Sequence, residues 1–399
     1  MYILILAIVI AVLVALSLSF GPVARSARWS ATVTPLASII GSGFLICGPL
    51  LAKEFGAAAL GAELILLAIA YAMGAVMRFN ILHVEDYLEA SPFNDRVAWL
   101  ARISQVVLAL AYAVSVAYYL KLLAEFGLRP FHVDPTHHAL ASNILVTVII
   151  AGLISLAFFG NLKRVEGLAH GTVAVKLGVI AGMMVALAAF WIIHGAHAPV
   201  PPTVINLHSL PMLLGLLITV QGFETSRYLG YAYDKQTRIV TMRRAQWISS
   251  AIYAAFLLLL TPFLSQAAAT PGVAGILDIM ESVAPFLGLL VLAGAISSQM
   301  SAAVADSIGA GGLMNEVSQK RLSVPVAFVA AAGLSLVLVW ITDPFQVIAL
   351  SSRAFAVFYA LQCGLGLWVS LRTGRGGRWA RAGMVVVGLV CLTAAAVGA

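Results

Sequence analysis

The stretch TPLASIIGSGFLICGP, from Thr34 to Pro49, lies where a membrane-spanning helix is expected, yet its centre is Gly41-Ser42-Gly43. Two glycines and a serine are the composition of a turn. A broken helix at membrane depth survives only where it is buried in protein or lines a polar cavity, because the bilayer offers no water to the freed backbone groups. A break here therefore predicts a membrane protein of several helices, in which other helices or a polar cavity surround the freed backbone groups.

The composition places the whole chain in the membrane. The chain has 399 residues, of which 62% are hydrophobic and 10% are charged, whereas a soluble domain is about half apolar and about a quarter charged. A helix that crosses a bilayer needs roughly 20 mostly apolar residues, and such runs recur from end to end. The sequence therefore predicts an all-α polytopic membrane protein, with residues 1–399 forming a single transmembrane domain.

Twelve apolar segments are expected to span the membrane, a leading helix followed by eleven numbered spans: 2–20, 33–53, 57–77, 100–125, 140–160, 168–193, 208–231, 246–268, 281–310, 323–342, 346–371 and 379–397. The leading helix lacks the basic start of a signal peptide, and no A-x-A-like cleavage site precedes Gly21. This favours a retained helix over a cleaved leader. The last segment, 379–397, is expected to be a terminal helix.

Lysines and arginines indicate the orientation, because cytoplasmic loops of membrane proteins carry an excess of them. With the loop of Arg25 and Arg28 placed in the cytoplasm, seventeen of the 23 fall on that side and three, Lys53, Lys121 and Arg129, on the other. Both termini are then expected to face outward. Because the net charge of +7 is spread over short loops, a nucleic-acid partner is not expected.

A second stretch repeats the break. TVQGFETSRYLGYAYD, beginning at Thr219, places Gly222, Glu224 and Arg227 inside an apolar segment about 180 residues after Ser42. Five spans separate the starts of the two units, an odd number, so two similar units would be inverted. The expected units are 33–193 and 208–371, and interrupted helices in corresponding positions point to a secondary transporter with a midplane site.

The broken helices give a chemical reason for such a site. The N-terminus of a half-helix carries partial positive charge and receives anionic groups, and glycine lets a ligand approach the backbone closely. Close packing of helices is the alternative explanation for the glycines. The expected substrate-binding residues are Ile40, Gly41, Ser42, Gly43, Gln221, Gly222, Phe223, Glu224 and Thr225.

These stretches resemble a known family. IIGSGFLICGP is similar to the first-helix motif of the amino acid–polyamine–organocation (APC) superfamily, QGFETSRYLGYAYDKQTRIVTMRRAQ to its sixth helix and following loop, and AHGTVAVKLGVIAGMM to its fifth helix. The resemblance implies the five-plus-five inverted repeat of the sodium–leucine transporter (LeuT-type fold), with broken first and sixth core helices and one extra helix at each end. The leading helix, VEDYLEASPFNDR and ISSQMSAAVADS resemble instead the sodium–solute symporter branch.

Ionisable residues inside spans are functional candidates because burying them in a membrane is costly. The resemblance implies that Lys176 projects to where a sodium ion sits in sodium-coupled relatives, which favours H⁺ as the coupling ion; snorkelling to the interface is the alternative. Ser297 and Ser298 resemble a hydroxyl pair that ligates sodium, so Na⁺ is the alternative coupling ion. Arg227 and Arg353 are candidate gating residues.

Three further expectations concern position. Glu224 and Arg227 are spaced for pairing along a helix, and either is an alternative contact for substrate. Asp306 is expected near the cytoplasmic end of its span. The segment Ser91–Ile103 is expected to be an interfacial helix.

The predicted function is secondary active transport of an amino acid or related small organic solute across the cytoplasmic (inner) membrane of a prokaryote. The partners are then the lipid bilayer and the solute, and the sequence leaves the oligomeric state open. Neither a phosphate loop nor an HExxH motif occurs, no metal or organic cofactor is expected, and an enzyme is not indicated. A sodium-coupled symporter of another solute or ion, and a non-transporting membrane sensor, are the alternatives.

Overall fold

The structure is a computed structural model of the chain. It describes residues 1–398 except 23, 25, 42, 91–94, 132, 160–161, 196–200, 204, 207–208, 231 and 270–274, and of residues 156–172 it describes no side chain. Ser42 and the side chains of Lys163 and Arg164 therefore lie outside the described part. The described residues form helices joined by short turns.

The long helices are α1 (Tyr2–Phe20), α4 (Ala59–Phe79), α6 (Arg96–Leu128), α7 (Pro135–Phe159), α8 (Leu162–His194), α10 (Lys235–Leu260), α13 (Leu287–Val317), α14 (Val324–Ile341), α15 (Pro344–Thr373) and α16 (Gly377–Val397). The shorter helices are α2 (Ala27–Ile39), α3 (Gly43–Phe55), α5 (Glu85–Ala90), α9 (Ser209–Gly215), α11 (Leu264–Ala269) and α12 (Ile276–Val283). The remaining turns of helix are η1 (Gly56–Ala58), η2 (Asn80–Val84), η3 (Arg129–Phe131), η4 (Leu216–Val220), η5 (Phe223–Leu229) and η6 (Thr261–Phe263).

The expected segments match these helices. Within the described residues, nine stretches are long and apolar enough to cross a membrane, and one of them, Ala27–Ala90, holds two expected spans. The shorter apolar helix Pro325–Ile341 and the broken segment from α9 to η5 correspond to the other two. The first break separates α2 from α3, and the second separates η4 from η5 at Gln221 and Gly222.

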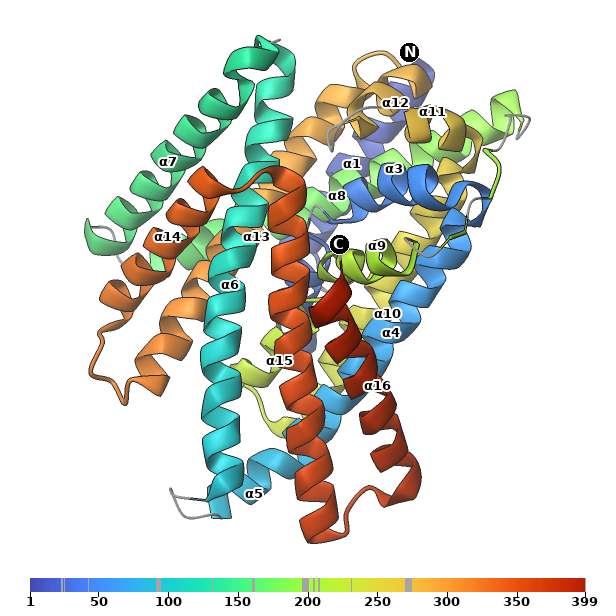
Figure 1. Cartoon of the computed structure of the whole chain (residues 1–399). Helices are drawn as coiled ribbons and strands as arrows, with labels where there is room; N and C mark the ends of the chain where they lie inside the picture. The colour runs from blue at the N-terminus through green and yellow to red at the C-terminus, as the bar shows by residue number, and fades with distance from the viewer. Residues whose placement is uncertain are drawn as a thin grey trace.

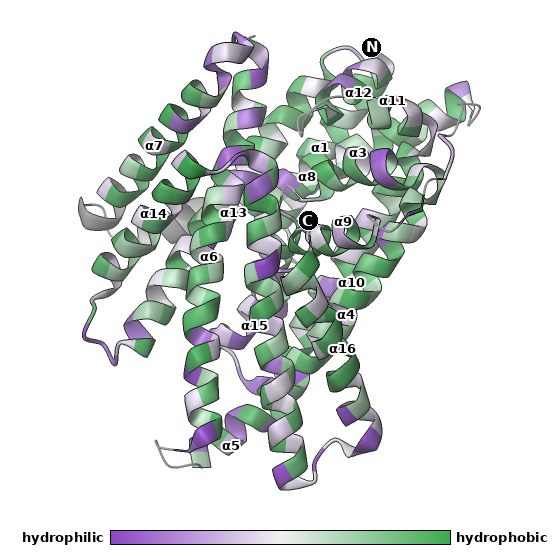
Figure 2. Ribbon diagram, viewed as in Figure 1, coloured by the Kyte–Doolittle hydropathy of each residue, from purple (hydrophilic) through white to green (hydrophobic). Residues whose placement is uncertain are grey.

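The helices form one bundle whose hydrophobic residues cover most of its height, with hydrophilic residues towards the two ends (Figure 2). α6 runs beside α15 and also packs on α13 and α14, while α10 packs on α2 and α4 (Figure 1). α1 packs on α8, where a Cβ on Gly178 or Gly182 would meet the backbone of Ala11 or Ala7. The glycines therefore let these two helices approach closely.

Two of the positional expectations are wrong. Asp306 lies in the middle of α13 and is 1% exposed, because the helix continues through the more polar residues that follow the apolar run. Within Ser91–Ile103, the described residues from Arg96 onward are the first turns of the continuous helix α6 rather than a separate interfacial helix. Arg96 and Arg102 lie in these first turns, where α6 extends beyond its apolar section.

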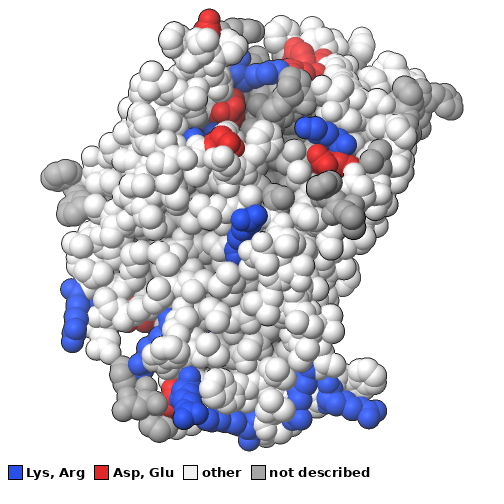
Figure 3. Space-filling view, in the orientation of Figure 1, with Lys and Arg blue, Asp and Glu red and all other residues white. Residues whose placement is uncertain are grey.

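The two ends of the bundle differ in charge. Lysine and arginine side chains gather at the end that carries α5 and the turn between α15 and α16 (Figure 3). We call this the α5 end, and the opposite end, which carries α11 and α12, the α12 end (Figure 1). Lys121, counted on the side with few basic residues, is 5% exposed within α6 and donates to Asn143 and to the Thr342 carbonyl.

Candidate functional site

The first break frees carbonyl groups at the end of α2, and three side chains donate to them. Lys176 Nζ of α8 lies 2.7 Å from both the Ala37 and the Ile40 carbonyl oxygens. Ser298 Oγ of α13 lies 3.3 Å from the Ile40 oxygen, and Tyr253 OH of α10 lies 3.1 Å from the Ile39 oxygen. Lys176 is 1% exposed, so its side chain does not reach an interface. Ser297 is only half-buried.

The second break is shaped by one glycine. Gly222 has a φ of 122°, which L-residues other than glycine rarely adopt, and it directly precedes η5 as its N-cap. Its N–H donates to Glu224 Oε2 at 3.0 Å, and its carbonyl accepts from Thr225 Oγ1 at 2.8 Å. The N–H and carbonyl groups of Gly222 are thus bonded within the segment itself.

The two breaks pack directly on each other. A Cβ at Gly43 would lie 2.7 Å from Thr219 Cα, and a Cβ at Gly222 would lie 2.6 Å from the Ser38 carbonyl carbon. Tyr253 also donates to the Thr219 carbonyl, so one hydroxyl joins both segments. A side chain at either glycine would meet atoms of the facing segment, so in this state the two glycines allow the breaks to pack closely.

Two carboxyl groups are buried beside the second break. Glu224 accepts from Tyr359 OH of α15 at 2.6 Å and from Tyr112 OH of α6 at 3.4 Å. Asp306 Oδ2 accepts from Ser115 Oγ of α6. Glu224 and Asp306 are 0% and 1% exposed. The site thus gathers residues of α6, α13, α15 and η5.

The expected pairing of Glu224 with Arg227 is wrong. Arg227 donates to Gln362 Oε1 of α15, while Glu224 turns back to the N–H that the break leaves free at Gly222. The neighbouring candidates Gln221 and Phe223 contact Tyr359: Gln221 Oε1 lies 3.3 Å from the Tyr359 hydroxyl oxygen, and the Phe223 ring stacks on the Tyr359 ring with centroids 5.3 Å apart.

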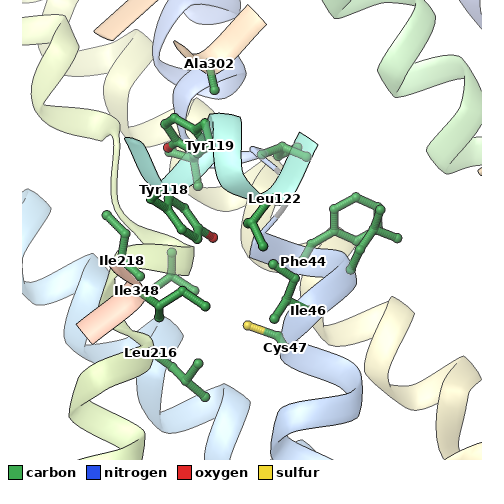
Figure 4. Close-up of a cluster of buried hydrophobic side chains, with 14 of the residues drawn as sticks. Phe44, Ile46, Cys47, Tyr118, Tyr119, Leu122, Leu216, Ile218, Ala302 and Ile348 are labelled. Atoms are coloured by element: carbon green, nitrogen blue, oxygen red, sulfur yellow. The ribbon is translucent and has the colours of Figure 1, made fainter. Parts of the chain in front are cut away.

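Apolar side chains fill the space next to the breaks. Tyr118 and Leu122 of α6 belong to one cluster with Ile46 of α3 and Ile218 of η4 (Figure 4). A cavity of about 10 Å³ adjoins Lys176 and Ser298, which is room for about one water molecule. The described site is therefore closed in this state, and a solute needs the helices to move apart.

A polar layer closes the site on the α5 side. Arg238 of α10 donates to both carboxylate oxygens of Glu85, at 2.9 and 2.7 Å, and to the Arg227 carbonyl at 2.7 Å. The side chain of Gln362 donates to Ser104 Oγ at 2.5 Å and accepts from Asn80 Nδ2 at 2.9 Å. These contacts tie η5 to α5, α6, α10 and α15.

We expect Arg238→Gln to open this layer, because the substitution removes the bidentate ion pair with Glu85 and leaves its carboxylate without that partner. A cysteine placed at Ser104, which is 0% exposed, reports the opening once the native cysteines are replaced. It should resist a small thiol reagent in the parent and react in the Arg238→Gln variant.

The matched control is Lys235→Gln, which breaks the more exposed pair with Asp86 and should leave the cysteine protected, because exposed pairs contribute little. Equal reactivity in the parent and in both variants would contradict a role for Arg238 in closing the layer.

Several site residues were missed by the sequence reasoning. Tyr112, Ser115, Tyr253 and Tyr359 carry hydroxyl groups inside long apolar helices, which was the available signal, but their convergence on the breaks depends on tertiary packing. Arg353, a candidate gating residue, donates from Nε to the Gly398 carbonyl at 2.6 Å and thereby joins α15 to the end of α16.

Comparison with known proteins identifies the family. A family described as "APC superfamily transporter" matches residues 21–398, nearly the whole chain. The chain belongs to the APC superfamily. A protein of Aquifex aeolicus (strain VF5), described as uncharacterized, is 36% identical to this APC-superfamily chain over 353 residues, covering 87% of this chain and 85% of the relative. The chain is thus a secondary transporter by family, and no enzyme.

A solved structure supports the fold. The structure of a Na⁺-coupled sialic acid symporter, in a substrate-bound outward-open state, matches with a TM-score of 0.53 over 98% of this chain and 95% of that one. At 15% identity, this similarity concerns the LeuT-like fold and not the solute or the ion.

Proposed function

We propose that this APC-superfamily protein moves an amino acid or a related small organic solute across the cytoplasmic membrane of a prokaryote, by alternating access and in symport with protons. The pair of adjoining helix breaks, with buried polar groups from α6, α8, α13 and α15 around them, carries the proposal. Irregular backbone at membrane depth is tolerated where it lines a site, and the closed state described above is one step of such a cycle.

Proton coupling is supported by the position of Lys176. Its ammonium group donates to the Ala37 and Ile40 carbonyls, and Ser298 donates to the same Ile40 oxygen. Carbonyl and hydroxyl oxygens are the ligands of a hard cation, so the ammonium takes the place that a sodium ion would need. A buried lysine that changes protonation between states would link solute movement to protons.

Sodium coupling is the second candidate, favoured by the Ser298 hydroxyl at the break and by a similar fold in a Na⁺-coupled symporter. Imposed gradients distinguish the two. Proteoliposomes should accumulate the solute under an inside-alkaline pH gradient without sodium, and a protonophore should abolish accumulation. Accumulation that requires a sodium gradient and resists the protonophore would instead assign the coupling to sodium.

The rival of another class is a membrane sensor that binds the solute without moving it. A thermal-shift screen of the purified protein with amino acids, amines, nucleobases and inorganic ions identifies the ligand. Exchange of that ligand, labelled inside proteoliposomes, for unlabelled ligand outside identifies a transporter. Binding without exchange would identify a sensor.

We also propose that both termini face outward and that residues 33–193 and 208–371 form two inverted units. The two units then start on opposite faces of the membrane. A cysteine at Arg28 should react with an impermeant reagent only after permeabilisation, and one at Leu210 on intact cells. Reaction of both from the same side would contradict the inversion.

A further inference from the structure

A cleft of about 620 Å³ opens at the α12 end of the bundle. One wall is formed by the end of α6, η3 and the beginning of α7, and the other by α12 and the beginning of α13. Both walls stand at the α12 end (Figure 1), where hydrophilic residues replace the hydrophobic ones that cover most of the bundle (Figure 2). The described lining residues belong to neither helix break. The cleft is therefore separate from the transport site.

The two walls of this cleft carry opposite charges. Arg129 of η3 stands on the first wall, and Asp278 and Glu281 of α12 stand on the second. Arg129 and Asp278 form an ion pair from wall to wall, and their side chains are 42% and 47% exposed. An exposed pair contributes little to stability, so a ligand can take over its partners at small cost. The cleft suits a ligand that offers a negative charge to Arg129 and a positive charge to the acidic wall.

Next to these charges the lining is apolar. Phe286, Leu289 and Leu292, at the beginning of α13, line the cleft, and the first two are exposed. Ala293, one helical turn beyond Leu289, is exposed as well, so an apolar stripe leads from the cleft along α13. Phe286 has a φ of 67°, which is uncommon for a residue other than glycine, and its N–H donates to Glu281 Oε1 at 2.9 Å. A carboxylate of the acidic wall thus holds the backbone of the exposed ring.

We propose that the cleft binds one phospholipid with a primary-amine headgroup, of the phosphatidylethanolamine class. Its phosphate accepts from the Arg129 guanidinium, whose paired N–H donors match phosphate oxygens. Its ammonium has three donors and meets the carboxylates of Asp278 and Glu281, while an acyl chain lies along Phe286 and Leu289. A headgroup with both charges satisfies both walls, whereas an anionic phospholipid leaves the acidic wall without a partner. This inference goes beyond the transport function and does not depend on it.

Three lipids with identical acyl chains test the headgroup. The purified, delipidated protein is titrated in detergent with phosphatidylethanolamine, phosphatidylcholine or phosphatidylglycerol, and native mass spectrometry counts the bound molecules. Phosphatidylcholine keeps both charges but donates no hydrogen bond from its quaternary ammonium, and phosphatidylglycerol lacks the amine. One molecule of phosphatidylethanolamine should bind about fivefold more tightly than either, because hydrogen bonds to charged groups are the stronger ones.

A cysteine at Leu289 tests the place of binding, once the native cysteines are replaced. Phosphatidylethanolamine should slow its reaction with a thiol reagent more than phosphatidylcholine does. A cysteine at Leu64 is the matched control, because Leu64 is exposed on α4 and does not line the cleft. The two lipids should protect this second cysteine equally. Equal protection by the two lipids at Leu289 as well would overturn the assignment to the cleft.

Two variants separate the two charges of the headgroup. Arg129→Gln removes the partner of the phosphate and should weaken phosphatidylethanolamine and phosphatidylglycerol alike, by about fivefold. Asp278→Asn leaves the phosphate partner in place and should lower the preference for phosphatidylethanolamine over phosphatidylglycerol. The matched control is Arg378→Gln, which removes an exposed arginine from the first turn of α16 at the α5 end and should leave both affinities unchanged.

Four outcomes would overturn the proposal. Equal affinity for the three lipids would mean that the cleft meets bulk lipid only. Tighter binding of phosphatidylglycerol would replace the amine by an anionic headgroup. Protection of the Leu289 cysteine by free phosphoethanolamine, as strong as by the lipid, would assign the cleft to a water-soluble ligand. A lipid-free dimer in which this cysteine is already protected would assign the cleft to a second copy of the chain. Solute exchange in proteoliposomes tests the transport function separately.

Discussion

Gly222→Ala should abolish most transport and lower the thermal stability of the purified protein, although the added group is a single methyl. The backbone at Gly222 has a φ of 122°, and holding an L-residue in such a conformation costs about 1–3 kcal/mol. The new Cβ would also lie 2.6 Å from the Ser38 carbonyl carbon. The strain at Gly222 and the clash with Ser38 both involve backbone atoms. Neither segment can therefore relieve them by moving a side chain alone, and the two breaks would have to separate.

The measurement is the unfolding temperature together with solute exchange in proteoliposomes. Gly364→Ala is the matched control, because a Cβ at Gly364 in α15 meets nothing within 4 Å, and alanine there should be neutral or slightly stabilising. Wild-type stability and exchange in Gly222→Ala would contradict the packing of the two breaks. Normal stability with lost exchange would instead favour direct contact between this glycine and the solute.

Lys176→Ala should uncouple transport. The Lys176 ammonium donates to two carbonyls of the first break, so its removal eliminates the proposed proton carrier. We expect concentrative uptake to disappear while downhill exchange of the solute persists. The Ile40 carbonyl keeps Ser298 as a donor, but leaving the buried Ala37 carbonyl without the ammonium costs about 1–3 kcal/mol, so the unfolding temperature is measured in parallel.

Lys121→Ala is the control for that loss of stability. Lys121 is likewise buried and donates to a backbone carbonyl, that of Thr342, but its recorded partners, Asn143 and the Thr342 carbonyl, do not belong to the breaks. Its removal should lower stability while leaving the ratio of accumulated to external solute unchanged. Equal effects of the two substitutions on accumulation would show that Lys176 acts only by stabilising the fold.

Local sequence patterns predicted the spans and both breaks. Apolar runs about as long as a membrane helix locate α4, α6, α10 and α15, and Gly41 and Gly222 each interrupt such a run. The family resemblance also directed attention to Lys176. These features depend on residues close together in the chain, which a single sequence displays.

The composition of the site depended on contacts that the sequence does not display. Glu224 was expected to meet Arg227 because of their spacing, but the N–H freed at Gly222 and the Tyr359 hydroxyl hold its carboxyl. The depth of Asp306 was misjudged because hydropathy falls before α13 ends. Its contact with Ser115 joins residues 191 positions apart, which no local pattern predicts.

Proton movement driven by the solute tests the central claim most directly. Proteoliposomes loaded with a pH-sensitive dye, without imposed gradients and without sodium, receive the identified solute from outside, with a potassium shunt to hold the membrane potential at zero. The account predicts that the lumen acidifies in the wild type and in Lys121→Ala and stays unchanged in Lys176→Ala. Acidification of the same size in Lys176→Ala, or solute entry into wild-type vesicles with no proton movement, would contradict it.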